Sequence, residues 1–194
     1  MARRVATKKF NRVRPTIIGA GITEQWYFTH LQRIFGLKMK VCPRFFGQED
    51  VHALEKKIQQ VLNDEGFAVV VFDADVTTWD DKEKARLVRL KSKYAENKNV
   101  VLCDSLPSIE FWFLIHYANT TRTFRTSKDV IVQLKKYITN FDKNESFLKN
   151  EKWVRDMSAD GRLESAFKRA MDNSDGGSYS NVWKAFASLG MNFE

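Results

Sequence analysis

Apolar and polar residues follow two different periods along this chain, and these periods predict strands and helices in turn. Phe67–Phe72 is an unbroken apolar run, which is typical of a strand buried on both faces. Val51–Asp64 repeats apolar residues every three or four positions, as an amphipathic helix does. Strands are expected over Thr16–Gly19, Lys38–Phe46, Phe67–Phe72 and Asn99–Asp104, and helices over Glu24–Phe35, Val51–Asp64, Lys82–Ala95 and Glu110–Tyr117. This alternation predicts an α/β fold with a mostly parallel sheet sandwiched by helices.

The pattern changes after residue 119. A polar segment, Thr120–Thr126, is followed only by helical periods, over Lys128–Thr139, Phe147–Trp153, Gly161–Asn173 and Asn181–Leu189. We therefore predict an α/β domain over residues 15–119 and a helical subdomain over residues 120–194, packed on one edge of the sheet. Asp172–Ser180 is expected to be the most mobile loop, because two adjacent glycines give its backbone unusual freedom.

Two aspartates end the apolar run. On an extended strand Asp73 and Asp75 point to the same side, and two nearby carboxylates repel each other unless a cation lies between them. Hard oxygen ligands suit Mg²⁺ or Mn²⁺. The alternative is that both aspartates only open the turn before the next helix, since Asp is common in turns.

The N-terminal strand is followed by a second group of candidates. Gly19 and Gly21 allow a tight strand-to-helix turn, and Thr23 is the expected N-cap of the helix. Ligands collect at the carboxyl ends of parallel strands, so Ala20 is expected to lie beside the two aspartates. Glu24 is either a second metal-site or general-base carboxylate, or an acid favourably placed against the helix dipole.

Two further candidates lie in the segment IEFWFLIH. Glu110 is an acid inside an apolar run, which is costly to bury without a partner, although the helix dipole also explains an acid there. His116 follows six residues later and lies on a different helical face. It is a candidate catalytic residue or, alternatively, a core histidine bonded to the backbone.

These motifs together resemble known families. The strand–turn–helix and the later D-x-D resemble the Toprim domain of primases, topoisomerases and overcoming-lysogenization-defect-type nucleases. More specifically, Leu106–His116 and Ser178–Trp183 resemble signature segments of RloB-like proteins. The family's Gly-x-Thr-Glu-x-x-Tyr-Phe motif is matched by Gly21, Thr23, Glu24, Tyr27 and Phe28. The resemblance runs from about Pro15 to Leu189 and implies a Toprim-like fold.

The resemblance also implies a metal-dependent nuclease that cleaves DNA or RNA. In the family, a glutamate at the end of the first strand holds Mg²⁺ or Mn²⁺ together with the residues that correspond to Asp73 and Asp75. Ala20 occupies that position here and can neither bind a metal nor move a proton. The chain is therefore either a natural non-catalytic relative or an engineered inactive form, and the retention of Asp73, Asp75 and Glu110 favours the second explanation.

Two more expectations follow from the resemblance. Lys143 matches a Tyr-x-Lys position of RloB-like proteins and is expected to contact phosphate, the alternative being an ordinary surface lysine. A separate ATPase is the implied partner, in bacterial anti-phage defence, since this chain has no Walker motif. Rival functions are a non-catalytic module that binds nucleic acid or protein, and a phosphohydrolase that acts on nucleotides. The oligomeric state is left open.

Charge and composition lead to two further predictions, a contact with nucleic acid and a location in the cytoplasm. The net charge is +8, and much of it precedes the first acid, on Arg3, Arg4, Lys8, Lys9, Arg12 and Arg14. This basic, flexible arm over residues 1–14 is predicted to contact a phosphate backbone, the alternative being a solvated tail. No run approaches the roughly 18 apolar residues of a membrane span, and the basic N-terminus does not resemble a secretory signal. Cys42 and Cys103 are expected to be reduced core residues of a cytoplasmic protein.

Overall fold

A five-stranded sheet forms the centre of the molecule. The structure, a computed structural model, describes residues 14–42, 51–75, 81–173 and 177–191. The strands are β1 (Pro15–Gly19), β2 (Lys40–Val41), β3 (Phe67–Asp73), β4 (Val100–Leu106) and β5 (Tyr179–Ser180). They lie in the order β2-β1-β3-β4-β5, and only the pairing of β4 with β5 is antiparallel within the described residues. The predicted mostly parallel sheet is confirmed, and it is consistent with a Toprim-like α/β fold.

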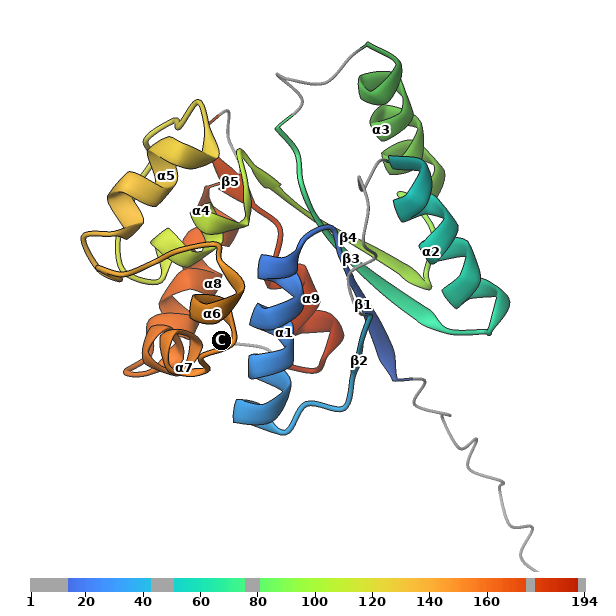
Figure 1. Cartoon of the computed structure of the whole chain (residues 1–194). Helices are drawn as coiled ribbons and strands as arrows, with labels where there is room; N and C mark the ends of the chain where they lie inside the picture. The colour runs from blue at the N-terminus through green and yellow to red at the C-terminus, as the bar shows by residue number, and fades with distance from the viewer. Residues whose placement is uncertain (1–13, 43–50, 76–80, 174–176, 192–194) are drawn as a thin grey trace, which may run out of the picture.

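Helices cover both faces of this sheet. In the described part of the chain they are α1 (Ile22–Phe35), α2 (Val51–Asn63), α3 (Asp81–Tyr94), α4 (Ile109–Ile115), α5 (Ser127–Leu134), α6 (Glu145–Leu148), α7 (Lys152–Ser158), α8 (Arg162–Asp172) and α9 (Trp183–Ser188). Figure 1 shows α2 and α3 on one side of the sheet and α1, α4 and the C-terminal helices on the other. The predicted α/β sandwich is therefore confirmed.

Neighbouring strand residues belong to two different cores. Ala68, Val70 and Phe72 pack with side chains of α2 and α3. Val69 and Val71 point the other way and pack with α1, α4 and the C-terminal helices. This two-sided burial explains why β3 is apolar at every position instead of alternating with polar residues.

The predicted elements differ from the observed ones at several boundaries. The expected strand Lys38–Phe46 is a strand only at Lys40–Val41, and its residues from 43 on lie outside the described residues. Thr23 is not the N-cap of α1, because the helix begins at Ile22 and Gly21 is the capping residue. In the C-terminal region, the expected helix Phe147–Trp153 is replaced by the two shorter helices α6 and α7.

The prediction of a loop over Asp172–Ser180 is wrong for its last two residues. Residues 174–176 lie outside the described residues, but Tyr179–Ser180 forms β5 at the edge of the sheet. The Ser178 hydroxyl accepts a hydrogen bond from the Phe124 backbone N–H at 2.8 Å, and the hydroxyl oxygens of Ser105 and Ser180 lie 2.9 Å apart. Ser178 and Ser180 are thus held by tertiary hydrogen bonds, which a local pattern does not reveal.

Residues 120–194 share a core with the α/β region. Val154, Met157, Phe167 and Phe186 pack in the same cluster as Tyr27 and Trp112. The C-terminal helices cover α1 and α4, and the same region adds β5 to the sheet. The side chains that build the site therefore come from both predicted units.

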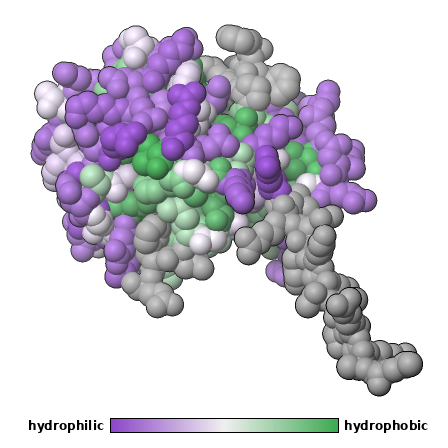
Figure 2. Space-filling model, turned by 90° about the horizontal axis from the view of Figure 1, so that it is seen from below, coloured by the Kyte–Doolittle hydropathy of each residue, from purple (hydrophilic) through white to green (hydrophobic). Residues whose placement is uncertain are grey.

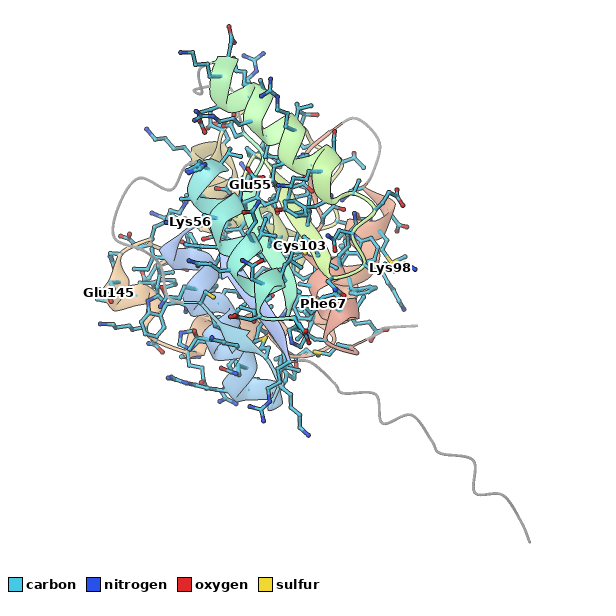
Figure 3. The ribbon with its side chains drawn as sticks, turned by 90° about the vertical axis from the view of Figure 1, so that its right-hand side faces the viewer. Glu55, Lys56, Phe67, Lys98, Cys103 and Glu145 are labelled. Atoms are coloured by element: carbon cyan, nitrogen blue, oxygen red, sulfur yellow. The ribbon has the colours of Figure 1, made fainter. Side chains whose placement is uncertain are left out.

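The surface differs from face to face. Seen from below, hydrophobic side chains reach the surface between hydrophilic flanks (Figure 2). Charged side chains cover the outer sides of α2 and α3, where Glu55 and Lys56 point outward (Figure 3). Among the described residues, none of the helices combines the length and the apolar character needed to cross a lipid bilayer.

Candidate active site

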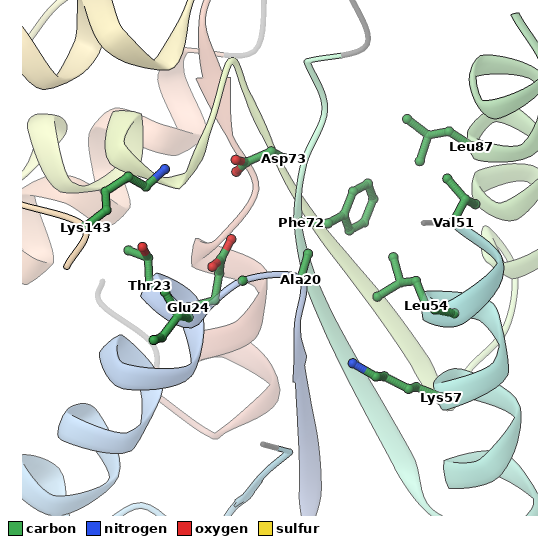
Figure 4. Close-up of a pocket in the computed structure, with 13 residues that line it drawn as sticks. Ala20, Thr23, Glu24, Val51, Leu54, Lys57, Phe72, Asp73, Leu87 and Lys143 are labelled. Carbon is green, nitrogen blue, oxygen red and sulfur yellow. The ribbon is translucent and has the colours of Figure 1, made fainter. Parts of the chain in front are cut away.

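A cleft of about 260 Å³ opens at the carboxyl ends of β1 and β3 (Figure 4). It lies between the start of α1 and the two helices α2 and α3. Its polar side is formed by Thr23, Glu24, Asp73 and Lys143, and its apolar side by Val51, Leu54, Phe72 and Leu87. The location agrees with the general rule for open parallel sheets, in which ligands bind where the strands end.

The turn between β1 and α1 brings Glu24 into this cleft. The Ala20 N–H donates to the Val71 carbonyl at 2.9 Å, which fixes the turn to β3. A Cβ atom added to Gly21 would lie 2.7 Å from Oε2 of Glu24, and one added to Gly19 would lie 2.8 Å from its Cβ atom. Both glycines are therefore required for the Glu24 side chain to fold back against the turn, where it is 4% exposed.

Asp73 lies at the end of β3, facing Glu24. Its Oδ1 atom accepts a hydrogen bond from the Ile109 N–H at 2.8 Å, at the start of α4. Burial raises the pKa of Glu24 to about 8, and the negative charge of Asp73 adds to this shift. Burial likewise raises the pKa of Asp73 to about 7, and Glu110 adds to it. The two carboxyl groups thus compete for ionisation at neutral pH.

Glu110 and Lys143 complete the group from the other side. Glu110 is fully buried, and Nζ of Lys143 lies 2.9 Å from its Oε1 atom. Burial alone would lower the pKa of Lys143, but Glu110, followed by Asp73 and Glu24, more than compensates and raises it. We call Glu24, Asp73, Glu110 and Lys143 the acidic cluster.

The acidic cluster has more carboxyl groups than ammonium groups. Three carboxyl groups surround one ammonium group, and in the described part of the chain Oε2 of Glu110 meets no hydrogen-bond donor. The described residues contain no group of three or more His, Cys, Asp or Glu side chains that could hold a metal ion. Mg²⁺ is often held by one or two carboxylates and keeps several waters, and Glu24 and Asp73 are the two cleft residues that could hold such an ion.

Asp75 lies at the margin of this arrangement. It is two residues beyond the end of the cleft-facing strand and is not among the residues that line the cleft. Its charge contributes to the raised pKa of Asp73, but less than Glu110 does. The carboxyl group that adds most to the raised pKa of Asp73 is therefore Glu110 of α4 and not the D-x-D partner. The predicted role of Asp75 as a metal ligand stays a prediction.

His116 lies away from the cleft. Its Nδ1 atom is 3.0 Å from the Met157 carbonyl, and its ring packs edge-on against Trp112 with the centroids 5.0 Å apart. Burial lowers the pKa of His116 to about 3, so the ring is neutral at physiological pH. The structure does not support the catalytic role expected for His116. It agrees with the alternative, a core histidine bonded to the backbone.

The predicted basic arm can be located only at its last residue. Arg3, Arg4, Lys8, Lys9 and Arg12 lie outside the described residues. Arg14 is exposed and immediately precedes β1, whose five residues separate it from the cleft by roughly 16 Å. A phosphate contact by the arm stays a prediction.

Lys57 is a cleft residue that the sequence reasoning missed. It belongs to α2, is 8% exposed and lines the cleft together with Leu54. In the sequence it is one of two adjacent lysines, which is typical of a solvated helix face. Its spacing of three from Leu54 was the available signal, since residues three apart share a face of a helix.

Comparison with known sequences gives one family. A family model described as "RloB-like protein" matches residues 16–185, a range that contains the whole acidic cluster, Asp75 and Ala20. Neither a curated protein nor a solved structure matches the chain. Because the matched range covers most of the chain, the protein belongs to the family of RloB-like proteins.

Proposed function

We propose that this chain carries a metal-dependent nuclease site of the Toprim type and that Ala20 makes this form inactive. The observation that carries the proposal is the position of Ala20. It directly follows β1 and lines the same cleft as Glu24 and Asp73 (Figure 4). A longer acidic side chain at this position would add a carboxylate to the cleft that Glu24 and Asp73 already line.

The side chains of the cleft have chemically distinct roles in this proposal. Asp73 and Glu24, with Asp75 at the margin, would hold Mg²⁺ or Mn²⁺, which would polarise the scissile phosphate and stabilise charge on the leaving oxygen. Lys143 is partly exposed and positively charged, so it would contact a phosphate oxygen. In the metal-free protein Glu24 has a pKa of about 8 and holds a proton at neutral pH, and it would release this proton when it binds the metal.

The biological setting extends the proposal. RloB-like family membership supports a role in bacterial anti-phage defence, in which a partner ATPase would supply the nucleotide-dependent step. A site that contacts the phosphate through a metal ion and a lysine would accept either DNA or RNA, because both have the same phosphate group. The main alternative is a non-catalytic module that binds nucleic acid or protein, and the observation that favours it is Ala20 itself, because alanine supplies neither a ligand nor a base.

Restoring the acid tests the proposal. Ala20→Glu should raise Mn²⁺- or Mg²⁺-dependent cleavage of DNA or RNA at least about 100-fold, the range expected of a general base. Ala20→Gln is the matched control, since it has the same size and no charge, and it should stay inactive. The assay uses single- and double-stranded DNA and RNA with each metal, with and without a partner ATPase. If a folded Ala20→Glu protein cleaves nothing under these conditions, the nuclease proposal is wrong and the non-catalytic alternative remains.

A further inference from the structure

We propose that the apolar side of the cleft binds the base of the nucleotide whose phosphate the acidic cluster engages. This inference rests on the proposed function and adds a substrate requirement to it. A cleft that only held a sugar–phosphate backbone would be lined mainly by cations and polar groups. Here Val51 and Leu54 of α2, Leu87 of α3 and Phe72 of β3 form a wall opposite Glu24 and Asp73 (Figure 4).

The position of the wall suits one base beside one phosphate. Phe72 and Asp73 are consecutive in β3, so their side chains point to opposite sides of the sheet and reach the two sides of the cleft. A ligand that spans both sides must therefore have an ionic part and a flat or bulky apolar part. The volume of about 260 Å³ is slightly below the about 300–1,000 Å³ of drug-sized sites, and it suits a single nucleoside.

Lys57 adds a polar element within the apolar side. Its side chain extends from α2 toward the sheet beside Leu54, and it is 8% exposed (Figure 4). A lysine ammonium group offers three donors and no acceptor. A base that presents a carbonyl oxygen or a ring nitrogen would therefore be preferred by Lys57, in the way that a few polar groups set the orientation of a ligand in an apolar cleft.

Small ligands distinguish the contribution of the base to binding from that of the phosphate. The four nucleoside 5′-monophosphates, ribose 5-phosphate and inorganic phosphate are titrated into the full chain by calorimetry in the presence of Mn²⁺. At least one monophosphate should bind about tenfold more tightly than ribose 5-phosphate, the lower range of base-stacking contributions. Equal affinities of all probes, or no measurable binding of any monophosphate, would overturn the proposal.

A plug in the cleft tests the location. Ala53 lines the cleft and is half-buried, so Ala53→Trp fills the apolar side without removing a core side chain. His52→Trp is the matched control, because it places the same indole on the neighbouring, exposed position of α2. Ala53→Trp should remove the preference for monophosphate over ribose 5-phosphate, and His52→Trp should keep it. If Ala53→Trp and His52→Trp show the same preference for monophosphate over ribose 5-phosphate, the base does not bind on the apolar side of the cleft.

A charge removal tests the contribution of Lys57. Lys57→Met retains the aliphatic stem and should weaken binding of the preferred monophosphate at least about tenfold, the lower range for a hydrogen bond to a charged group. Lys56→Met changes the adjacent lysine, which points outward, and should have no effect (Figure 3).

The two proposals can fail separately. If Ala20→Glu is inactive while monophosphates bind in the manner described, the base site stands and the nuclease proposal fails. If Ala20→Glu cleaves nucleic acid and the added Ala53→Trp substitution leaves its rate unchanged, the nuclease proposal stands and the base site fails.

Discussion

Two aspartates on neighbouring strands have opposite surroundings. Asp104 of β4 accepts hydrogen bonds from Lys91 at 2.6 Å, Tyr179 at 2.8 Å and Asn181 at 2.8 Å. Burial would raise the pKa of Asp104, but these donors, with Lys91 first, lower it below its ordinary value. Asp73 of β3 has one backbone donor, and burial and the neighbouring Glu110 raise its pKa to about 7.

The difference separates a structural carboxylate from a candidate functional one. The donors of Asp104 come from α3 and the C-terminal segment, so this side chain holds β5 and the region after it against the sheet. Asp73 lies among other acids, an arrangement that costs stability and that proteins concentrate at functional sites. The family resemblance of Ser178–Trp183 thus has a structural explanation, because two of the three donors belong to that segment.

The largest expected effect on stability comes from removing the Asp104 carboxylate, which accepts three hydrogen bonds. Asp104→Ala should lower the free energy of unfolding by about 3 kcal/mol at pH 7, because it leaves three donors without their acceptor. Urea denaturation followed by circular dichroism measures the change. Tyr179→Phe removes one of the three hydrogen bonds and should cost about 1 kcal/mol. A loss below about 0.5 kcal/mol for Asp104→Ala would mean that the network contributes no more than an exposed ion pair.

The second prediction concerns the pH dependence that the acidic cluster produces. Glu24 has a pKa near 4.5 when unfolded and about 8 when folded, so the folded state binds the proton more tightly. Its contribution to stability is therefore lost as the pH rises from about 4.5 to 8, and we expect the free energy of unfolding to fall between pH 5 and 8 in metal-free buffer. Glu24→Gln should make this slope shallower, and the part that comes from the raised pKa of Asp73 should remain.

The matched control for this experiment is Glu145→Gln, which changes an exposed carboxylate at the start of α6 (Figure 3). Its stability profile should retain the slope between pH 5 and 8. Asp104 has the opposite sign, since its lowered pKa stabilises the fold above about pH 4 and is lost only in more acidic buffer. If the free energy of unfolding of Glu24→Gln changes with pH in the same way as that of the parent chain, the raised pKa assigned to Glu24 is wrong.

The third prediction compares the contributions of Asp73 and Asp75 to Mn²⁺ binding. Mn²⁺ at tenfold its Kd should stabilise the parent chain by about 1.4 kcal/mol, seen as a rise in Tm. Asp73→Asn should reduce this rise strongly, because Asp73 lines the cleft, and Asp75→Asn should reduce it less. Without metal, Asp73→Asn should be as stable as the parent or slightly more stable, since it removes a repelling charge. An unchanged rise in the double variant would exclude both residues as ligands.

The smallest expected effect on the fold comes from the basic arm. Deletion of residues 1–14 should leave Tm and the Mn²⁺ response unchanged and should make nucleic-acid binding less sensitive to salt. Loss of three phosphate contacts would change the slope of log K against log salt by about 2.7 on duplex DNA. Binding titrations at several salt concentrations measure this slope. An identical slope in both forms would assign the arm to the solvated-tail alternative.

Much of the sheet and its helices could be predicted from the sequence, because local patterns report local burial. The apolar run of β3 requires cover on both faces, and the three- and four-residue spacing of α2 requires one buried face. The rule that parallel strands end at one edge placed Ala20 beside Asp73 and Asp75, and in the structure Ala20 and Asp73 line one cleft while Asp75 is not among its lining residues. These inferences depend only on the conformation of short segments.

Tertiary structure alone decided which side chains meet across long distances in the chain. Glu110 pairs with Lys143, Tyr179 reaches Asp104, and His116 turns into the core, and none of these contacts follows from a local period. The same holds for Lys57, whose surroundings depend on how α2 packs against the sheet. A pattern determines which face of a segment avoids water, but the pKa of a carboxyl group and its partners depend on charges that the folded chain brings within a few ångströms.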